Sequence, residues 1–231
     1  MTEADLTISK ETEARIRAAF PEDQFFSEET QEQTEPVPIT SEFVWIIDPV
    51  DGTNNFAIGA AMCAISLGLL HQGVPVYGFI YDHTRQVIMH GGKGYGAFDG
   101  DRVMKPSERT ASNELFAAFD GFSAKRLFTL LSALRGQGFK MRNVGSGTLH
   151  LAHTANGLLD GSFSNRVSIW DVAAAIALCD AAGSEFNEFG ESFFPMTQFE
   201  LKAPKMYYYA GTPFFCRAVE RIWKEAGVFP Q

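Results

Sequence analysis

The sequence predicts a mixed α and β fold, with a first half made mainly of adjoining strands and a second half in which strands and helices alternate. Up to residue 110, short apolar runs rich in β-branched and aromatic residues follow one another with turns between them. After residue 110, such runs alternate with longer segments that begin and end at helix-capping residues. The chain has 231 residues, 45% hydrophobic and 20% charged, which is typical of a globular protein. We therefore expect one domain over residues 1–231, with a sheet-rich half at 1–110 and an alternating half at 111–231.

The first half is expected to hold one helix and a series of strands. Apolar residues at near-helical spacing predict a helix over Leu6 to Phe20, which Pro21 follows. The stretch Glu28 to Glu42 is polar and acidic, which indicates an exposed loop. The expected strands come, in chain order, at Phe43–Ile47, Ala64–Leu70, Val74–Tyr81, Val87–His90 and Tyr95–Phe98.

The second half is expected to alternate strands with capped helices. Strands are predicted at Leu115–Phe119 and Met206–Tyr209. Serine, glycine and proline at the boundaries indicate where the helices begin and end. The expected helices are Ser123–Arg135, Ser146–Asn156, Trp170–Ala182 and Pro213–Ala226.

Charge and cysteine content limit the partners and the compartment. The 28 acidic and 19 basic side chains give a net charge of −9, which argues against a nucleic acid or an anionic membrane as the main partner. Cys63, Cys179 and Cys216 have no C-x-x-C spacing and stand in apolar stretches, so we expect buried thiols. The chain starts without a signal-peptide pattern and has no apolar run of membrane-spanning length. We expect a soluble, cytoplasmic protein.

Several familiar catalytic motifs are absent from the sequence. It has no G-x-x-x-x-G-K-[ST] loop, no G-x-G-x-x-G spacing, no G-x-S-x-G elbow and no His-Glu-x-x-His pair. His150 and His153 are three residues apart on an expected helix and could share a face that binds a metal. Without a nearby acidic or cysteine partner in the sequence, two ordinary buried or surface histidines are the favoured interpretation.

The most informative stretch is W-I-I-D-P-V-D-G-T-N-N-F at residues 45–56. Asp48 and Asp51 end an apolar strand, where two carboxylates are costly to bury unless they are paired or bound to cations. Mg²⁺ prefers carboxylate oxygens, and the proline between the two acids fixes the backbone so that both side chains and a main-chain carbonyl can converge. Gly52 and Thr53 offer N–H groups and a hydroxyl for an anionic phosphate. The alternative is a strand-to-helix turn that binds no metal.

Two further acids could join this site. Glu28 follows the short apolar pair Phe25-Phe26, and Asp171 follows Trp170 at the start of an apolar helix. Taken alone, Asp171 is a helix-terminal carboxylate that the helix dipole favours. Taken alone, Glu28 is an ordinary loop charge.

Together these residues resemble the inositol monophosphatase family of Mg²⁺-dependent, lithium-sensitive phosphatases. The family's D-P-[IV]-D-G-T-x-x-F signature is matched at Asp48–Phe56, and its W-D-x-A-A signature at Trp170–Ala174. Thr2–Asp5 is similar to its T-x-A-D segment, and Val144–Ser146 to its V-G-[ST] segment. Ser27-Glu28-Glu29 stands where Gly-Glu-Glu is usual, so Ser27 needs a backbone with negative φ to avoid strain. The resemblance runs from residue 2 to about residue 190. Family members carry an additional helix before T-x-A-D, and this sequence, which starts at that segment, is either a short gene product or a fragment of a longer one.

The resemblance implies a fold, a cofactor and a set of roles. The fold would be the layered αβαβα sandwich of the inositol monophosphatase and fructose-1,6-bisphosphatase type, usually a homodimer. Two or three Mg²⁺ would be held by Glu28, Asp48, Asp51, Asp171 and the carbonyl of Val50. Glu28 and Thr53, the latter oriented by Asp5, would be the catalytic residues that position and deprotonate the attacking water. The substrate would be held by Asp51, Gly52, Thr53, Gly145, Ser146 and Asp171.

The substrate itself stays open at this point. Inositol-specific members carry an acidic residue where this chain has Ser164, and Arg166 nearby would suit a second anionic substituent or be a solvated charge. The expected substrate is inositol monophosphate or a similar small polyol or sugar phosphate. Histidinol phosphate, fructose 1,6-bisphosphate and nucleotide 3′,5′-bisphosphates are alternatives. A regulatory protein without activity, on the same fold, is the rival from another functional class.

Overall fold

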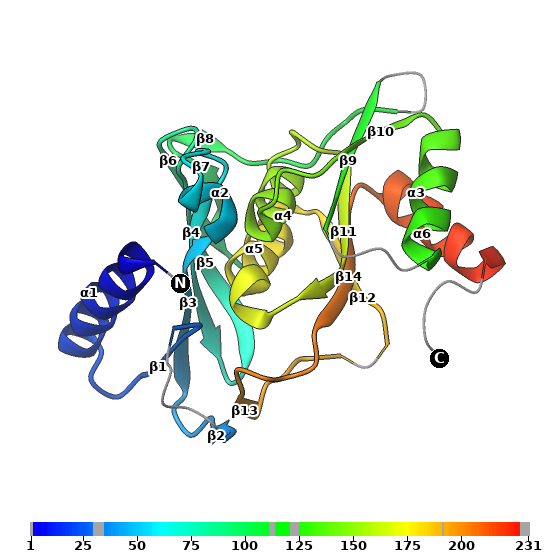
Figure 1. Ribbon diagram of the computed structural model, residues 1–231. Helices are drawn as coiled ribbons and strands as arrows, with labels where there is room; N and C mark the ends of the chain where they lie inside the picture. The colour runs from blue at the N-terminus through cyan, green and yellow to red at the C-terminus, as the bar shows by residue number, and fades with distance from the viewer. Residues whose placement is uncertain (1, 30–34, 111–113, 121–124, 191, 227–231) are drawn as a thin grey trace.

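Helices and sheets stack in five layers, in the order α, β, α, β, α (Figure 1). The computed structural model describes residues 2–29, 35–110, 114–120, 125–190 and 192–226. The first layer is helix α1 (Glu3–Ala19), and the middle layer is formed by α4 (Gly147–Ala155) and α5 (Ile169–Ala182). The last layer contains α3 (Lys125–Gly136) and α6 (Pro213–Ala226). This arrangement is the αβαβα sandwich that the resemblance implies.

A seven-stranded sheet forms the second layer and lies between α1 and α5. Its strand order is β1-β3-β4-β5-β6-β7-β8, with β1 parallel to β3 and each other neighbouring pair antiparallel. The strands are β1 (Gln24–Ser27), β3 (Phe43–Asp51), β4 (Ala64–His71), β5 (Val74–Asp82), β6 (Val87–Gly92), β7 (Gly96–Asp99) and β8 (Arg102–Val103). Between β3 and β4 lies the short helix α2 (Thr53–Ala57).

A five-stranded sheet forms the fourth layer, with the order β10-β9-β11-β14-β12. Its first three strands are parallel, and β14 is antiparallel to both of its neighbours. The strands are β9 (Leu115–Asp120), β10 (Phe139–Arg142), β11 (Gly161–Val167), β12 (Glu185–Glu188) and β14 (Met206–Gly211). A separate pair, β2 (Val37–Pro38) and β13 (Gln198–Phe199), joins two loops.

Helix α5 packs closely on the large sheet because both surfaces carry small residues. A Cβ added to Gly78 of β5 would lie 2.2 Å from the carbonyl oxygen of Ala174, and one added to Gly68 of β4 would lie 2.9 Å from the Ala173 Cβ. The apolar residues of α5 are almost all buried, so the helix is core on every side. This packing brings the start of α5 to the sheet edge at which β1 and β3 end.

The expected elements agree with the structure except at short or polar strands. The four-residue strand β1 lies just before the stretch expected to be a loop, and β2 lies within that stretch. Strands β10, β11 and β12 are polar or short and have no strong period-two pattern, so they were not expected. Helix α1 begins at Glu3, earlier than predicted, because Thr2 and Asp5 form a capping box. The predicted helix start at Ser123 lies outside the described residues.

The expectations about cysteines are confirmed. Cys63, Cys179 and Cys216 are buried and have free thiols. Within the described part of the chain, no helix combines the length and the apolar character needed to span a membrane.

Candidate active site

The site is built at the ends of two parallel neighbours, β1 and β3. Their register pairs Ser27 with Ile47, so Glu28 and Asp48 follow side by side, and the Glu28 N–H donates to the Ile47 carbonyl at 3.3 Å. The β3–β4 register shifts between Asp48 and Asp51, at the end of the ladder. Parallel pairing brings Glu28 beside Asp48, and the irregularity lies between Asp48 and Asp51 at the same edge of the sheet.

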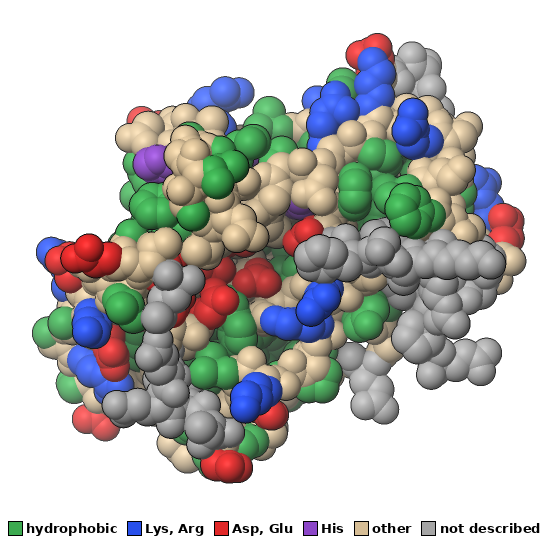
Figure 2. Space-filling view, in the orientation of Figure 1, with side chains coloured by type: hydrophobic (Ala, Val, Ile, Leu, Met, Phe, Trp, Pro, Cys, Tyr) green, Lys and Arg blue, Asp and Glu red, His purple; other side chains and the backbone are tan. Residues whose placement is uncertain are grey.

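Three carboxylates converge at this edge. One oxygen each from Glu28, Asp48 and Asp171 lie within 4.8 Å of one another. Asp48 is buried, Asp171 is half-buried and Glu28 is exposed, so the group opens to solvent on one side. Figure 2 shows acidic side chains together in a hollow of this face, with basic side chains at its border. We call Glu28, Asp48, Asp171 and the adjoining Asp51 the carboxylate cluster.

Asp51 connects the cluster to the start of α4. Its Oδ2 accepts hydrogen bonds from the Ser146 hydroxyl at 2.5 Å and from the Thr148 N–H at 2.7 Å. Ser146 is the N-cap of α4, and its hydroxyl oxygen also accepts from the Leu149 N–H at 3.2 Å. Asp51 therefore fixes the first turn of α4 relative to the end of β3.

Asp171 is positioned by the first turn of α5. It forms a capping box with Ser168, whose N–H donates to Asp171 Oδ2 at 2.8 Å. The Asp171 carbonyl accepts from the Thr148 hydroxyl at 2.7 Å. The interpretation of Asp171 as a helix-terminal carboxylate is thus correct, and the same side chain also belongs to the cluster.

Burial raises the pKa values of all four carboxyl groups, and repulsion between members of the cluster adds to the rise for Glu28, Asp48 and Asp171. Burial is the largest cause for each of them. The charge of Asp51 then adds to the effect on Glu28, Asp48 and Asp171, and the pKa of Asp171 reaches about 8. Hydrogen bonds from Ser146 and Thr148 partly oppose the rise at Asp51. Such a group of acids favours bound cations, because positive charge relieves the repulsion.

The turn after β3 brings two further candidate residues to the cluster. Gly52 has φ +90°, and a Cβ there would lie 2.9 Å from the Met62 carbonyl oxygen, so this position suits glycine. The Thr53 hydroxyl donates to the Val50 carbonyl at 2.9 Å. Asn55 Nδ2 donates to the carbonyls of Met62 and Val144, each at 2.7 Å, and so ties this turn to the loop before α4.

The loop before α4 carries Gly145 in the left-handed region, at φ +75°. The Gly145 N–H donates to Asn143 Oδ1 at 2.9 Å, and the Val144 N–H donates to His150 Nε2 at 2.9 Å. Burial lowers the pKa of His150 to about 3, so the ring is neutral and accepts this bond. His153 instead lies against Asp82, with 2.9 Å between Nε2 and Oδ2. The two histidines therefore have separate structural partners.

The other candidate residues, Asp5, Ser164 and Arg166, have hydrogen-bond partners of their own. Asp5 is buried in α1, where its carboxylate accepts from the Thr2 N–H, and its orienting effect on Thr53 stays a prediction. Ser164 is buried in β11, and its hydroxyl oxygen accepts from the Arg166 N–H at 3.2 Å. The Arg166 side chain is exposed.

Sequence reasoning did not single out two polar residues here, Thr148 and Lys205. Thr148 binds both Asp51 and the Asp171 backbone, and its place in the first turn of α4 was the signal that could have identified it. Lys205 contacts Ser168 from a segment distant in sequence, which no local pattern indicates. Ser27 lies outside the positive-φ residues, and its buried hydroxyl oxygen accepts from Ser9 Oγ at 2.8 Å, so serine replaces glycine without strain.

Comparison with known proteins identifies the family. Residues 1–224 match the sequence model of the inositol monophosphatase family. The chain belongs to the inositol monophosphatase family. It is 32% identical over 199 residues to the inositol-1-monophosphatase of Bacillus subtilis. The aligned region covers 80% of this chain and 73% of that protein. As a member of this family, the chain is a phosphoric monoester hydrolase. Asp48 and Asp51 of the cluster lie in the segment 48–56, and Asp171 lies in the segment 170–174.

Solved structures of the inositol monophosphatase family share the fold. The extragenic suppressor protein suhB of Bartonella henselae superimposes with a TM-score of 0.80 at 28% identity, over 97% of this chain and 84% of that one. An IMPase/NADP phosphatase complexed with Mg²⁺ and phosphate superimposes with a TM-score of 0.81 at 20% identity, over 100% of this chain and 84% of that one. At 20% identity the second comparison supports the fold alone.

Proposed function

We propose that the chain is a Mg²⁺-dependent phosphomonoesterase that hydrolyses inositol monophosphate or a similar small polyol or sugar phosphate. The observation that carries this proposal is the carboxylate cluster, in which oxygens of Glu28, Asp48 and Asp171 approach within 4.8 Å beside Asp51. The membership of the chain in the inositol monophosphatase family supports the same reaction class.

The donors of the cluster fit Mg²⁺. They are carboxylate oxygens, the ligands that this hard cation prefers, and the Val50 carbonyl adjoins them. The absence of a His or Cys from this group disfavours zinc. We propose that Glu28, Asp48, Asp51, Asp171 and the Val50 carbonyl hold two or three Mg²⁺ ions. When bound, the cations would neutralise the charge of the phosphate, lower the pKa of a bound water and stabilise the leaving alkoxide.

The chain's own residues position the reactants. We assign the positioning and deprotonation of the attacking water to Glu28 and Thr53, with Asp5 behind Thr53. Glu28 is suited to accept a proton because one side of its carboxylate borders solvent while the rest lies against the protein. This partial burial, together with the charges of Glu29 and Asp51, raises its pKa. The water then attacks phosphorus in line, and no covalent phosphoenzyme is needed.

The substrate phosphate is assigned to the start of α4 and the turn after β3. Gly52 and Thr53 offer backbone N–H groups on one side, and Gly145 and Ser146 on the other. Hydrogen bonding by Asn55 holds these two loops together. We also assign the Asp51 and Asp171 carboxylates to the lining of the substrate site.

A phosphate-release assay tests this function. The wild-type chain is incubated with inositol 1-phosphate, histidinol phosphate, fructose 1,6-bisphosphate and adenosine 3′,5′-bisphosphate, each with and without Mg²⁺. We expect release that requires Mg²⁺ and decreases when Li⁺ is added, as the family resemblance implies. Inactivity on every ester would contradict the proposal and favour the regulatory alternative. We further propose that the protein is a cytoplasmic homodimer. Light scattering of the protein as it elutes from a size-exclusion column would measure the molar mass of the assembly.

A further inference from the structure

Lys205 lies between β13 and β14 at the edge of the carboxylate cluster. Its exposed side chain donates to the Ser168 hydroxyl, and its ammonium lies 5.3 Å from the centroid of the Trp170 ring. Ser168 is the N-cap of α5, and its N–H donates to Asp171 Oδ2 at 2.8 Å. The ammonium therefore contacts Ser168 and Trp170, and both residues are close to Asp171 of the cluster.

The positive charge of Lys205 acts on this cluster. It lowers the pKa values of Glu28 and Asp171, against the larger upward effect of burial. The hydroxyl and the ring that contact the ammonium are uncharged, so the carboxylates balance its charge. Two Mg²⁺ would neutralise the four carboxylates, and the ammonium would then be a net positive charge at the border of the site.

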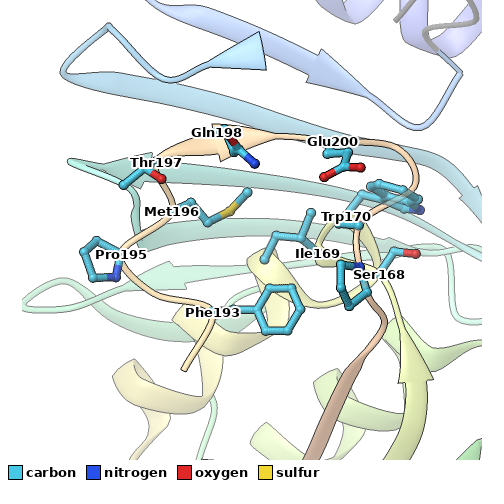
Figure 3. A pocket seen from close by; sticks show the side chains of 11 residues that line it. Ser168, Ile169, Trp170, Phe193, Pro195, Met196, Thr197, Gln198 and Glu200 are labelled. Atoms are coloured by element: carbon cyan, nitrogen blue, oxygen red, sulfur yellow. The ribbon is translucent and has the colours of Figure 1, made fainter. Parts of the chain in front are cut away.

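A pocket of about 210 Å³ is lined by Pro204, the chain neighbour of Lys205. Ser168, Ile169 and Trp170 form one side of it, and eight residues between Phe193 and Pro204, with Glu200 as the one acidic side chain, form the rest (Figure 3). Its lining is mostly apolar with a few polar groups, which suits the organic part of a small ligand. Since Ser168 and Trp170 contact both the pocket and the ammonium, a group at this end of the pocket lies next to Lys205.

The hydrolysis proposed above gives Lys205 no role. The phosphoryl group is assigned to the Asp51 and Ser146 side of the cluster, whereas Lys205 lies on the Asp171 and Ser168 side. A substrate group that meets the ammonium therefore belongs to the alcohol part of the ester. An ammonium selects for negative charge at that place.

We propose that Lys205 is a specificity-determining residue that pairs with an anionic group on the alcohol part of the substrate, either a carboxylate or a second phosphate. The inference rests on the proposed phosphatase function and narrows its substrate class. Esters whose alcohol carries a second negative charge are preferred to esters of neutral polyols, and the alcohol lies toward the pocket beside α5.

Two matched pairs of esters test this inference on the full chain with Mg²⁺. Glycerol 3-phosphate and 3-phosphoglycerate differ by a carboxylate, and fructose 1-phosphate and fructose 1,6-bisphosphate differ by a phosphate. In Lys205→Met, KM for the anionic member of at least one pair rises about tenfold, the effect of one charge-assisted hydrogen bond. The kcat values and the KM of the neutral members stay within about twofold. The pair that responds distinguishes a carboxylate from a phosphate.

Matched variants separate the contact from general effects of charge or folding. Lys205→Arg keeps the charge and should keep the wild-type preference, whereas Lys205→Gln should repeat the pattern of Lys205→Met. Lys202→Met removes an exposed charge from the same segment and should leave every KM unchanged. An equal change for both members of each pair, or a wild type without preference for the anionic members, would overturn the inference and leave the phosphatase function intact. Wild-type inactivity on all four esters would overturn the inference alone if inositol 1-phosphate is still hydrolysed, and would overturn the phosphatase function as well if it is not.

Discussion

The acids of the site act through their distance from one another rather than through their individual types. Asp48, Asp51 and Asp171 each have a local structural explanation. Asp48 accepts a hydrogen bond from the Val50 N–H near the end of β3, and Asp51 accepts one from the first turn of α4. Asp171 is the partner of the N-cap Ser168 in the capping box of α5. Their convergence with Glu28 gives them raised pKa values and the capacity to bind cations. The family resemblance predicted the set, and the fold explains why these four acids meet.

The raised pKa of Asp171 predicts how pH affects the metal-free protein. Its pKa is about 8 in the folded chain against an ordinary 3.8, so the folded state binds the extra proton between these values. The free energy of unfolding therefore falls as pH rises from about 4 to about 8. Excess Mg²⁺ binds the ionised form and should reverse this fall. Thermal unfolding at a series of pH values, in EDTA and in Mg²⁺, measures both effects.

Two variants check that the cluster is the origin of this pH dependence. Asp171→Asn should reduce the difference between the EDTA and Mg²⁺ curves. Asp180→Asn, at the exposed far end of the same helix, should leave it unchanged. Parallel curves with and without Mg²⁺ for the wild-type protein would refute the explanation.

Asn55 is predicted to hold two loops of the site together. Asn55→Leu removes both hydrogen bonds from its Nδ2 and leaves the Met62 and Val144 carbonyls without that donor. We expect a loss of about 1–3 kcal/mol in the free energy of unfolding and weaker Mg²⁺-dependent phosphate release, because Thr53 and Ser146 lose their relative position. Urea unfolding and the phosphate assay measure these effects. Asn54→Ala, at an exposed neighbour, is the control, and equal behaviour of the two variants would count against this role.

At the scale of elements, the site depends on how closely α5 packs on the large sheet. Gly68 and Gly78 allow that approach, and the helix carries Asp171 in its first turn. The same helix contacts β3, from whose end Asp48 and Asp51 project. The distance between helix and sheet therefore sets the distance between the acids.

A methyl group between α5 and β5 should disturb both folding and the site. The Cβ of Gly78→Ala would lie 2.2 Å from the Ala174 carbonyl oxygen, so α5 must shift. We expect a loss of about 1–3 kcal/mol in the free energy of unfolding and weaker binding of Mg²⁺. Gly136→Ala, at the end of α3 with nothing within 4 Å of the added carbon, should be close to wild type. Urea unfolding and Mg²⁺ titration compare the two, and a wild-type-like Gly78→Ala would disprove the packing argument.

The elements also show where sequence reasoning succeeds. Long segments with caps, such as α5 and α6, and strands with clear apolar runs, such as β3 and β4, could be predicted because local pattern and tertiary position agree. Strands β10, β11 and β12 could not, because their stability comes from neighbours in the sheet rather than from their own residues. The contacts of Lys205 could not be predicted either, because its partners Ser168, which lies 37 residues earlier in the chain, and Trp170 are both at the start of α5.

For the whole molecule, the site joins the two halves of the chain. Glu28, Asp48 and Asp51 come from residues 1–110, and Ser146 and Asp171 come from the second half. The proposed chemistry thus requires the layered sandwich, because neither half holds the complete set of proposed ligands. The family resemblance predicted this assembly from two short signatures, whereas composition and periodicity predicted only a mixed fold.

The most direct test of this account is the Mg²⁺ dependence of phosphate release from inositol 1-phosphate by the wild-type chain and by Asp51→Asn. Asparagine keeps the size of the side chain but removes the charge that the cations need. We expect release by the wild type only when Mg²⁺ is present, and a loss of at least about 100-fold in the variant. Asp101→Asn, at an exposed turn, controls for a general effect of charge. Activity of Asp51→Asn close to that of the wild type would contradict the assignment of the carboxylate cluster as the catalytic metal site.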